Sequence, residues 1–260
     1  MIFDVKPAVV GHRGFGSGAL LGYRENSIES FLAAAASGAT WVELDVRRSS
    51  DDDLVVWHDP HSPAGLPVVT RTASQLADEG IVGLDGVLSA LPEGIGVDLD
   101  VKTVLDDALD PEGRRTHALV AEALGVHAGT RPLLVSSFDP SVPLYLRDRA
   151  ALASQVGLGL LTSQTLPPDH GVAAAVNLGL DVACLFVGSL GLDGDEGLAG
   201  GLAARAVEVA HRAGLEVMTW TASPAQATRA AAIGIDAVCV DDVPGTLAAL
   251  AVHRGARMAR

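Results

Sequence analysis

Cysteine, aromatic residues and positive charge are all scarce in this chain of 260 residues. Its two cysteines have no clustered partners, which excludes a disulfide-dense secreted scaffold and a cysteine zinc site. Aromatic residues make up 4% of the chain, so the core has to be built from Ala, Val and Leu. Eighteen Lys and Arg face 32 Asp and Glu, and the formal charge of -14 argues against a nucleic-acid-binding surface. Any phosphate that the protein binds therefore needs a local cation.

Targeting and membrane-spanning signals are also missing. Residues Met1–Pro7 lack the basic region and apolar stretch of a signal peptide, so a cytoplasmic location is expected, which the low cysteine content fits. The longest stretch without charge, Ala150–Pro168, contains Gln155, Gln164 and two prolines, which suit a membrane span poorly. We expect one domain over residues 1–260, with no stable membrane insertion. The sequence leaves the oligomeric state open.

Short apolar runs recur along the chain, with alanine-rich amphipathic segments between them. This alternation is typical of a parallel α/β protein, and eight such units over about 250 residues predict a (β/α)8 TIM barrel. The candidate strands are Ala8–Gly11, Trp41–Val46, Leu54–His58, Gly96–Val101, Leu133–Phe138, Gly157–Leu161, Val182–Val187, Glu216–Trp220 and Ala237–Val240. The clearest candidate helices are Ser27–Ser37, Arg114–Leu124, Leu198–Ala213, Ala225–Ile233 and Thr246–Arg254.

The second strand region holds one strand more than a barrel needs. Residues Trp41–His58 contain two candidate strands around a short polar turn, so one of them is expected to be a hairpin partner or an extension of the first. The stretch that follows contains several Pro and Gly residues and has no convincing period. We therefore expect a long loop or small insertion at about residues 60–86, on the face where barrel enzymes hold their chemistry.

Acidic residues are concentrated in two of the candidate strands. Glu43 and Asp45 share one face of their strand, as do Asp98 and Asp100, with Lys102 next in line, because side chains on a strand alternate. In a barrel one of these faces is the interior, where paired carboxylates stay ionised only beside positive charge. Such oxygen ligands suit a hard divalent cation, Mg²⁺ or Ca²⁺, and we expect one here.

Histidine and basic residues stand at strand ends. His12 and Arg13 follow the first candidate strand, and His58 ends the third. An imidazole titrates at about 6.5, which suits it to proton transfer near neutral pH. Arg13 and Lys102 can meet an anionic oxygen. The whole set predicts metal-assisted chemistry at a phosphoryl centre.

Several segments together resemble the glycerophosphodiester phosphodiesterase family, in the same order, at similar spacing and over almost the whole chain. The resemblance implies a (β/α)8 barrel that cleaves a small-molecule glycerophosphodiester to glycerol 3-phosphate and an alcohol, with a divalent metal. The segments that carry it are Gly11–Gly14, Arg24–Ser27, Gly38–Val46, Leu54–Asp59, Asp98–Lys102, Ser136–Phe138, Thr219–Thr221 and Gly234–Asp241.

The resemblance also implies a mechanism. His12 and His58 match the general acid/base pair of the family. The glycerol hydroxyl of the substrate attacks phosphorus, one histidine takes its proton, and the other protonates the leaving alkoxide. The cyclic phosphate that results is then hydrolysed.

Further roles carry over residue by residue. Glu43 and Asp45 match two metal ligands, and Asp100 stands where a third carboxylate ligand is expected. The family usually has Glu at that place, so a cation has to lie closer to the strand or be reached through water. Arg13 and Lys102 match cations that contact phosphate.

Some of these residues also have simpler structural interpretations. Glu43 and Asp45 could instead form an exposed polar strand face paired with Arg47 or Arg48. The remaining histidines are expected to be structural, although His61 is close enough to His58 in sequence to approach the site. They are His61, His117, His127, His170, His211 and His253.

Three positions near the expected site leave two interpretations open. Trp220, at a strand end, either packs in the core or contacts substrate. Asn26 and Ser27 lie near a helix start, where either one can cap free backbone N–H groups, and we interpret this block as mainly structural.

Two alternative functions stay open beside the leading one. The first is a lysophospholipase D or a sphingomyelinase D-like phosphodiesterase or lyase, which stops at the cyclic phosphate. The second is a non-catalytic phosphodiester-binding barrel, whose hallmark is the loss of a catalytic histidine, and neither is lost here. The leaving alcohol and the choice between Mg²⁺ and Ca²⁺ cannot be determined from the sequence.

Overall fold

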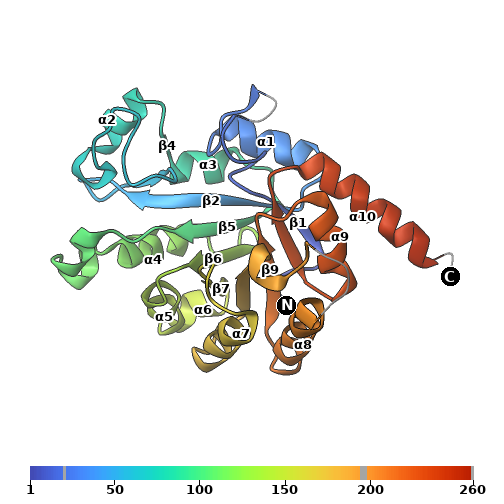
Figure 1. Cartoon of the computed structure of the whole chain (residues 1–260). Coiled ribbons are helices and arrows are strands. Elements are labelled where there is room, and N and C mark those ends of the chain that lie inside the picture. Colours follow the sequence, from blue (N-terminus) through green and yellow to red (C-terminus); the bar gives the residue numbers. More distant parts are fainter. Residues whose placement is uncertain (20–21, 194–197, 259–260) are drawn as a thin grey trace.

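The computed structural model describes residues 1–19, 22–193 and 198–258, and within them eight parallel strands close into the predicted (β/α)8 barrel (Figure 1). Each strand pairs with the next in the order of the chain, and β10 pairs back with β1. The barrel strands are β1 (Ala8–Gly11), β2 (Trp41–Arg48), β5 (Gly96–Val101), β6 (Leu133–Ser137), β7 (Gly157–Leu161), β8 (Val182–Phe186), β9 (Glu216–Trp220) and β10 (Ala237–Val240).

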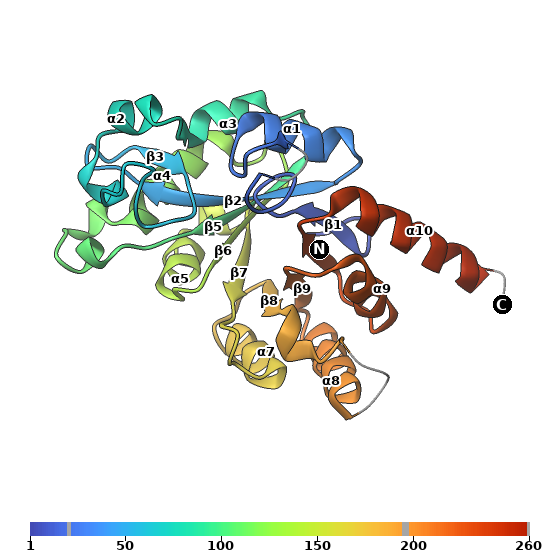
Figure 2. The same ribbon diagram turned by 45° about the horizontal axis from the view of Figure 1, so that its top comes forward.

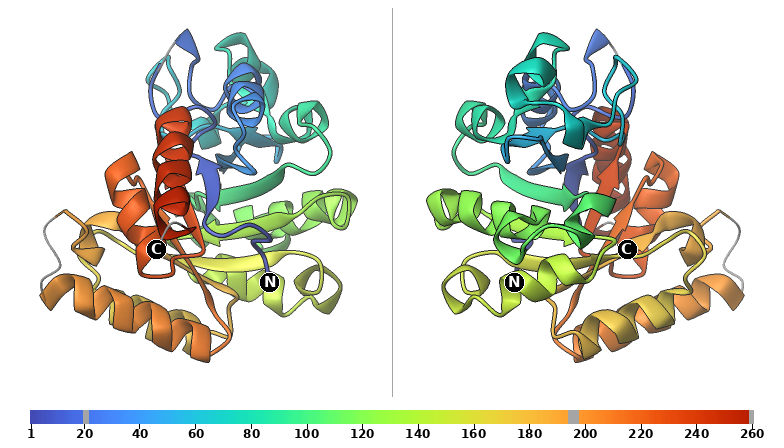
Figure 3. Two further views of the ribbon diagram at one scale, coloured as in Figure 1. Left: turned by 90° about the vertical axis from the view of Figure 1, so that its right-hand side faces the viewer. Right: turned by 90° about the vertical axis from the view of Figure 1, so that its left-hand side faces the viewer.

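Helices surround the barrel on its outside (Figure 2). Apolar side chains on the outer face of the strands, such as Val42 and Leu44 of β2 and Val97 and Leu99 of β5, form one large core with them. Figure 3 shows α7 and α8 side by side along one edge. The helices are α1 (Ile28–Ala36), α2 (Ala73–Asp78), α3 (Leu84–Ala90), α4 (Thr116–His127), α5 (Ser141–Arg147), α6 (Ala150–Ala153), α7 (Pro168–Asn177), α8 (Leu198–Arg212), α9 (Pro224–Ala232) and α10 (Val243–Met258).

The extra strand is the expected hairpin partner. β3 (Leu54–Val56) pairs antiparallel with β2, with Val46 opposite Val56 and Arg48 opposite Leu54. The pairing prolongs β2 beyond the barrel, as Figure 1 shows. The next stretch is more ordered than its composition indicates, because it contains a 3₁₀ turn, α2 and the two-residue β4 (Val82–Gly83).

The barrel interior changes from apolar to charged along its axis. Near the amino ends of the strands, the Trp41 ring packs edge-on against Phe3, with ring centroids 5.2 Å apart. A side chain at Gly96 would meet that indole, since a Cβ there would lie 2.2 Å from Trp41 Cδ2. Two and four residues further along β2, the same face carries Glu43 and Asp45. Glu43 and Asp45 therefore lie towards the carboxyl ends of the strands, next to an apolar layer that fills the opposite end of the barrel.

None of the helices in the described part of the chain combines the length and the apolar composition that crossing a bilayer requires.

Candidate active site

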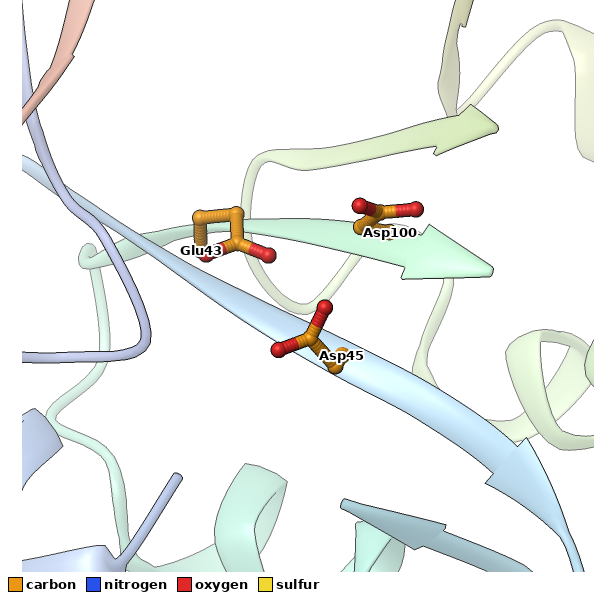
Figure 4. A group of neighbouring side chains, drawn as sticks. All are labelled: Glu43, Asp45 and Asp100. Atoms are coloured by element: carbon orange, nitrogen blue, oxygen red, sulfur yellow. The ribbon is translucent and has the colours of Figure 1, made fainter. Parts of the chain in front are cut away.

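Four carboxylates from two neighbouring strands line one cavity of about 530 Å³. Glu43 lies opposite Asp98 in the register of β2 and β5, and Asp45 lies opposite Asp100. All four residues are buried. Figure 4 shows the carboxylates of Glu43, Asp45 and Asp100 directed into the same space. The alternative of an exposed polar strand face is therefore wrong.

Burial makes it costly to ionise these four carboxyl groups. It raises the pKa of Glu43 well above its ordinary range, and the nearby charges of Asp45 and Asp100 add to the rise. It also raises the pKa of Asp98, which accepts a hydrogen bond from the Ser136 hydroxyl at 2.8 Å. The site therefore needs positive charge to keep its carboxylates ionised.

Lys102 supplies part of that charge. Its Nζ lies 3.0 Å from Asp45 Oδ1 and donates to Asp100 Oδ2. Burial acts to raise the pKa of Asp45, but the charges of Lys102 and His58 outweigh it, so the pKa falls below its ordinary value. Burial also raises the pKa of Asp100, although Lys102 acts in the opposite direction. The ammonium group thus lies between two of the carboxylates.

The carboxylates of Glu43, Asp45 and Asp100 fit a hard divalent cation. One ligand atom from each lies within 4.8 Å of the other two. Asp100 Oδ1 is buried and accepts no hydrogen bond from the described part of the chain. A buried oxygen without a donor is costly, and a cation would satisfy it. The three predicted ligands are therefore placed together, with a donor set that suits Mg²⁺ or Ca²⁺.

His12 lies at the carboxyl end of β1, between two acidic side chains. Its Nδ1 lies 2.8 Å from Asp241 Oδ1, and its Nε2 lies 4.0 Å from Glu43 Oε2. Asp241 directly follows β10, and it also accepts the backbone N–H of Ser17 at 2.8 Å. Burial acts to raise the pKa of Asp241, but these hydrogen bonds outweigh it and lower the pKa to about 2. Asp241 is thus an ionised acceptor that orients the imidazole.

Sequence reasoning did not single out Asp241 as a site residue. Its position directly after a buried strand, within the segment Gly234–Asp241 that carries the family resemblance, is the signal that could have identified it.

His58 approaches the cavity from the segment after β3. Its Nδ1 lies 2.9 Å from Asp59 Oδ1, and its side chain is 36% exposed. Both cavity histidines, His12 and His58, therefore have Nδ1 engaged by a carboxylate. In each ring, this arrangement leaves Nε2 as the nitrogen that can accept or donate a proton.

Arg13 contacts the carboxylates through its main chain and its side chain. Its φ of 50° lies in the left-handed region, and its backbone N–H donates to Glu43 Oε2 at 2.8 Å. The guanidinium donates to Glu25 at 3.0 Å and lies 3.4 Å from Asp45. The next residue, Gly14, has a φ of 94°, and a Cβ there would lie 2.5 Å from Ser30 Oγ. The turn after β1 therefore depends on this glycine.

The segment before α1 serves both a helix cap and the site. Ser27 caps α1 by accepting the Ser30 N–H. Asn26 is buried and donates from Nδ2 to Asp45 Oδ2 at 2.8 Å. It also accepts the Asp45 N–H at 3.3 Å. Ser27 is thus the capping residue. Asn26 instead contacts Asp45 and, like Asp241, is a site residue that the sequence did not single out.

Two aromatic side chains, Phe138 and Trp220, line the cavity. Trp220, at the end of β9, lies 5.7 Å from Phe138 and 4.7 Å from Phe186 between ring centroids. Lys102 Nζ lies 5.5 Å from the centroid of the Phe138 ring. Trp220 therefore both packs in a cluster and borders the cavity, so the two interpretations of this residue are compatible.

All eight predicted site residues line this one cavity, whereas none of the other six histidines does, all of which are among the described residues. The eight are His12, Arg13, Glu43, Asp45, His58, Asp100, Lys102 and Trp220.

Solved structures of phosphodiesterases share this architecture. A glycerophosphodiester phosphodiesterase from Thermotoga maritima superposes with a TM-score of 0.71 at 21% identity, covering 94% of this chain and 99% of that one. An Oleispira antarctica phosphodiesterase, solved in complex with the product sn-glycerol-3-phosphate, gives 0.72 at 23% identity, covering 95% and 97%. The chain therefore has the barrel fold of the glycerophosphodiester phosphodiesterases.

Sequence comparison assigns the family. The model of the glycerophosphoryl diester phosphodiesterase family matches residues 12–78 and 69–244, so the chain belongs to that family. The glycerophosphocholine phosphodiesterase of Eremothecium gossypii is 40% identical over 81 residues, which are 28% of this chain and 6% of that protein. A glycerophosphocholine phosphodiesterase of Homo sapiens is 26% identical over 198 residues, which are 55% of this chain and 30% of that protein. This chain thus spans only a small part of the length of these relatives.

Proposed function

We propose that this protein is a metal-dependent phosphodiesterase that hydrolyses a glycerophosphodiester to glycerol 3-phosphate and an alcohol. One observation carries the proposal: two histidines, each with Nδ1 on a carboxylate, border the same cavity as the group Glu43, Asp45 and Asp100. Family membership supports it. The names of the curated relatives and the product bound to the Oleispira enzyme indicate the same substrate class.

Glu43, Asp45 and Asp100 are the residues that would hold a divalent cation. When bound, such an ion offsets negative charge on the phosphoryl oxygens and orients the substrate. Lys102 and Arg13 both lie beside Asp45 and contribute positive charge next to these carboxylates. We expect both side chains to bind phosphate oxygens, with Arg13 offering a planar fork and Lys102 a compact charge.

The two histidines transfer the protons. Nε2 of one histidine takes the proton of the substrate's glycerol hydroxyl as its oxygen attacks phosphorus. Nε2 of the other gives a proton to the alkoxide as the bond from phosphorus to the leaving oxygen breaks. Water then opens the five-membered cyclic phosphate, with the two histidines in exchanged roles. Asp241 and Asp59 hold the imidazoles in the tautomer that presents Nε2.

Glycerol 3-phosphate release from glycerophosphocholine tests this assignment. His12→Ala and His58→Ala should each lower kcat by about 10²- to 10⁴-fold. His170→Ala is the matched control, because that side chain is 68% exposed and lies outside the cavity. A chelator should abolish activity in the wild type, and Mg²⁺ or Ca²⁺ should restore it. Full activity of both cavity variants would overturn the proposal.

A further inference from the structure

Arg47 is a buried arginine at the edge of the site. It lies on β2 two residues beyond Asp45, on the same face of the strand. At this point β2 has left the barrel and pairs with β3, where Arg47 lies opposite Val55. The residue is only 8% exposed. A long cationic side chain is rarely buried this far without a specific partner.

The partner of Arg47 is a single carbonyl oxygen. Its Nε and Nη2 both donate to the backbone oxygen of His58, at 2.9 and 2.6 Å. Within the described ranges no carboxylate comes within 4.0 Å of this guanidinium. Burial lowers the pKa of Arg47, and the more distant charges of Asp45 and Asp100 only partly offset this. Arg47 thus bears the cost of burial without an ion pair, and its two strong contacts are with His58.

His58 has few other restraints. It follows a strand of three residues, and its ring partner Asp59 has a side chain that is 68% exposed. The preceding residue, Trp57, donates its backbone N–H to the Asp45 carbonyl oxygen at 3.0 Å. The main chain at His58 is therefore attached to β2 by two links, one from the backbone of Asp45 and one from Arg47.

We propose that Arg47 is a positioning residue, whose guanidinium fixes the main chain of His58 so that the imidazole faces the carboxylates of β2. The inference rests on the proposed function, because it gives Arg47 a role through His58. A displacement of a catalytic group by about 1 Å can cost about 10²-fold in rate. Methionine at position 47 keeps most of the side-chain volume but loses both nitrogens that donate to the His58 oxygen. Lysine keeps the charge and one donor nitrogen.

Kinetics of Arg47→Met, Arg47→Lys and Arg47→Ala test the proposal. Arg47→Met should lower kcat by about 10²-fold with little change in KM, and Arg47→Lys should fall between Met and wild type. Guanidinium ion at millimolar concentration should restore part of the kcat of Arg47→Ala. Calorimetric titration with Mg²⁺ or Ca²⁺ should show no loss of affinity in any of the three variants relative to wild type.

Arg48→Met is the matched control, because Arg48 is the next residue of β2, is also buried, and contacts Asp107 and Asp110 instead of His58. Its kcat should stay within a few-fold of wild type, and guanidinium should not change that of Arg48→Ala. An unchanged kcat in folded Arg47→Met overturns the inference, as does a cation affinity that falls in step with kcat. If Arg47→Met does not fold, Arg47→Lys and the guanidinium rescue of Arg47→Ala decide. Full activity in both His12→Ala and His58→Ala would instead overturn the proposed function.

Discussion

His12 Nδ1 lies 2.8 Å from Asp241 Oδ1, although 229 positions separate the two residues in the sequence. The contact joins the ends of β1 and β10, the first and last strands of the barrel, which pair with each other. Barrel closure thus places an ionised acceptor beside an imidazole, and each strand end contributes one half of the pair.

Asp241→Asn should lower kcat by about 10²-fold or more, because the amide can stabilise the wrong imidazole tautomer. In that tautomer Nε2 carries the proton and cannot act as a base. Metal affinity should be unchanged, since Asp241 lies outside the group Glu43, Asp45 and Asp100. Steady-state kinetics and a cation titration check both parts. A wild-type kcat would show that the contact is structural only.

The same contact gives a pH dependence of stability. The pKa of Asp241 falls from its ordinary value of 3.8 to about 2 in the folded protein. The unfolded chain therefore binds more protons in this interval, so the contribution is complete above about pH 5 and is lost as the pH falls towards 2. The difference in Tm between wild type and Asp241→Asn should shrink over this range. A difference that stays constant from pH 6 to pH 2.5 would contradict it.

Glu43→Gln should separate stability from metal binding. Burial raises the pKa of Glu43, so ionising it destabilises the fold, increasingly as the pH rises above the unfolded value. In a chelator at pH 8 the variant should therefore melt about 2–4 °C above wild type, which corresponds to about 1 kcal/mol in a chain of this size. Thermal melts with Mg²⁺ or Ca²⁺ should reverse the order, because the variant loses one ligand. A lower Tm in chelator would count against this electrostatic account.

Arg48→Met should destabilise the fold by about 3 kcal/mol, because removal of the buried guanidinium leaves its carboxylate partners unpaired. Arg48 lies 3.2 Å from Asp107 Oδ1 and also contacts Asp110 and Asp52, which ties the segment after β5 to β2. Urea denaturation measures the change. Arg205→Met is a suitable control, because the Arg205–Glu208 pair on α8 is exposed and should contribute little to stability. Equal losses in the two variants would contradict the buried role of Arg48.

The sequence predicts the strands better than the helices, for a physical reason. Buried parallel strands appear as short apolar runs. On β5, Leu99 faces the surrounding helices, while Asp98 and Asp100 face the barrel interior. By contrast, α2 has six residues and buries only Leu76, so it carries no helical period. Its Thr72 and Gln75 form a capping box, which is the local signal that marks its start.

Some features of the candidate site could likewise be predicted from the sequence, and others could not. Glu43 and Asp45 could be paired from their spacing, because two positions on one strand share a face. The contacts of Asn26 with Asp45 and of Arg47 with the His58 carbonyl depend on how separate segments fold together. No periodicity encodes such contacts, so they become visible only in the structure.

Phosphorus NMR of glycerophosphocholine turnover tests the central claim most directly. With Mg²⁺ or Ca²⁺, the diester signal should give way to glycerol 3-phosphate, with a cyclic phosphate as a transient species. A chelator should stop the reaction. Phosphocholine as the product, or an undiminished rate in chelator, would contradict the account.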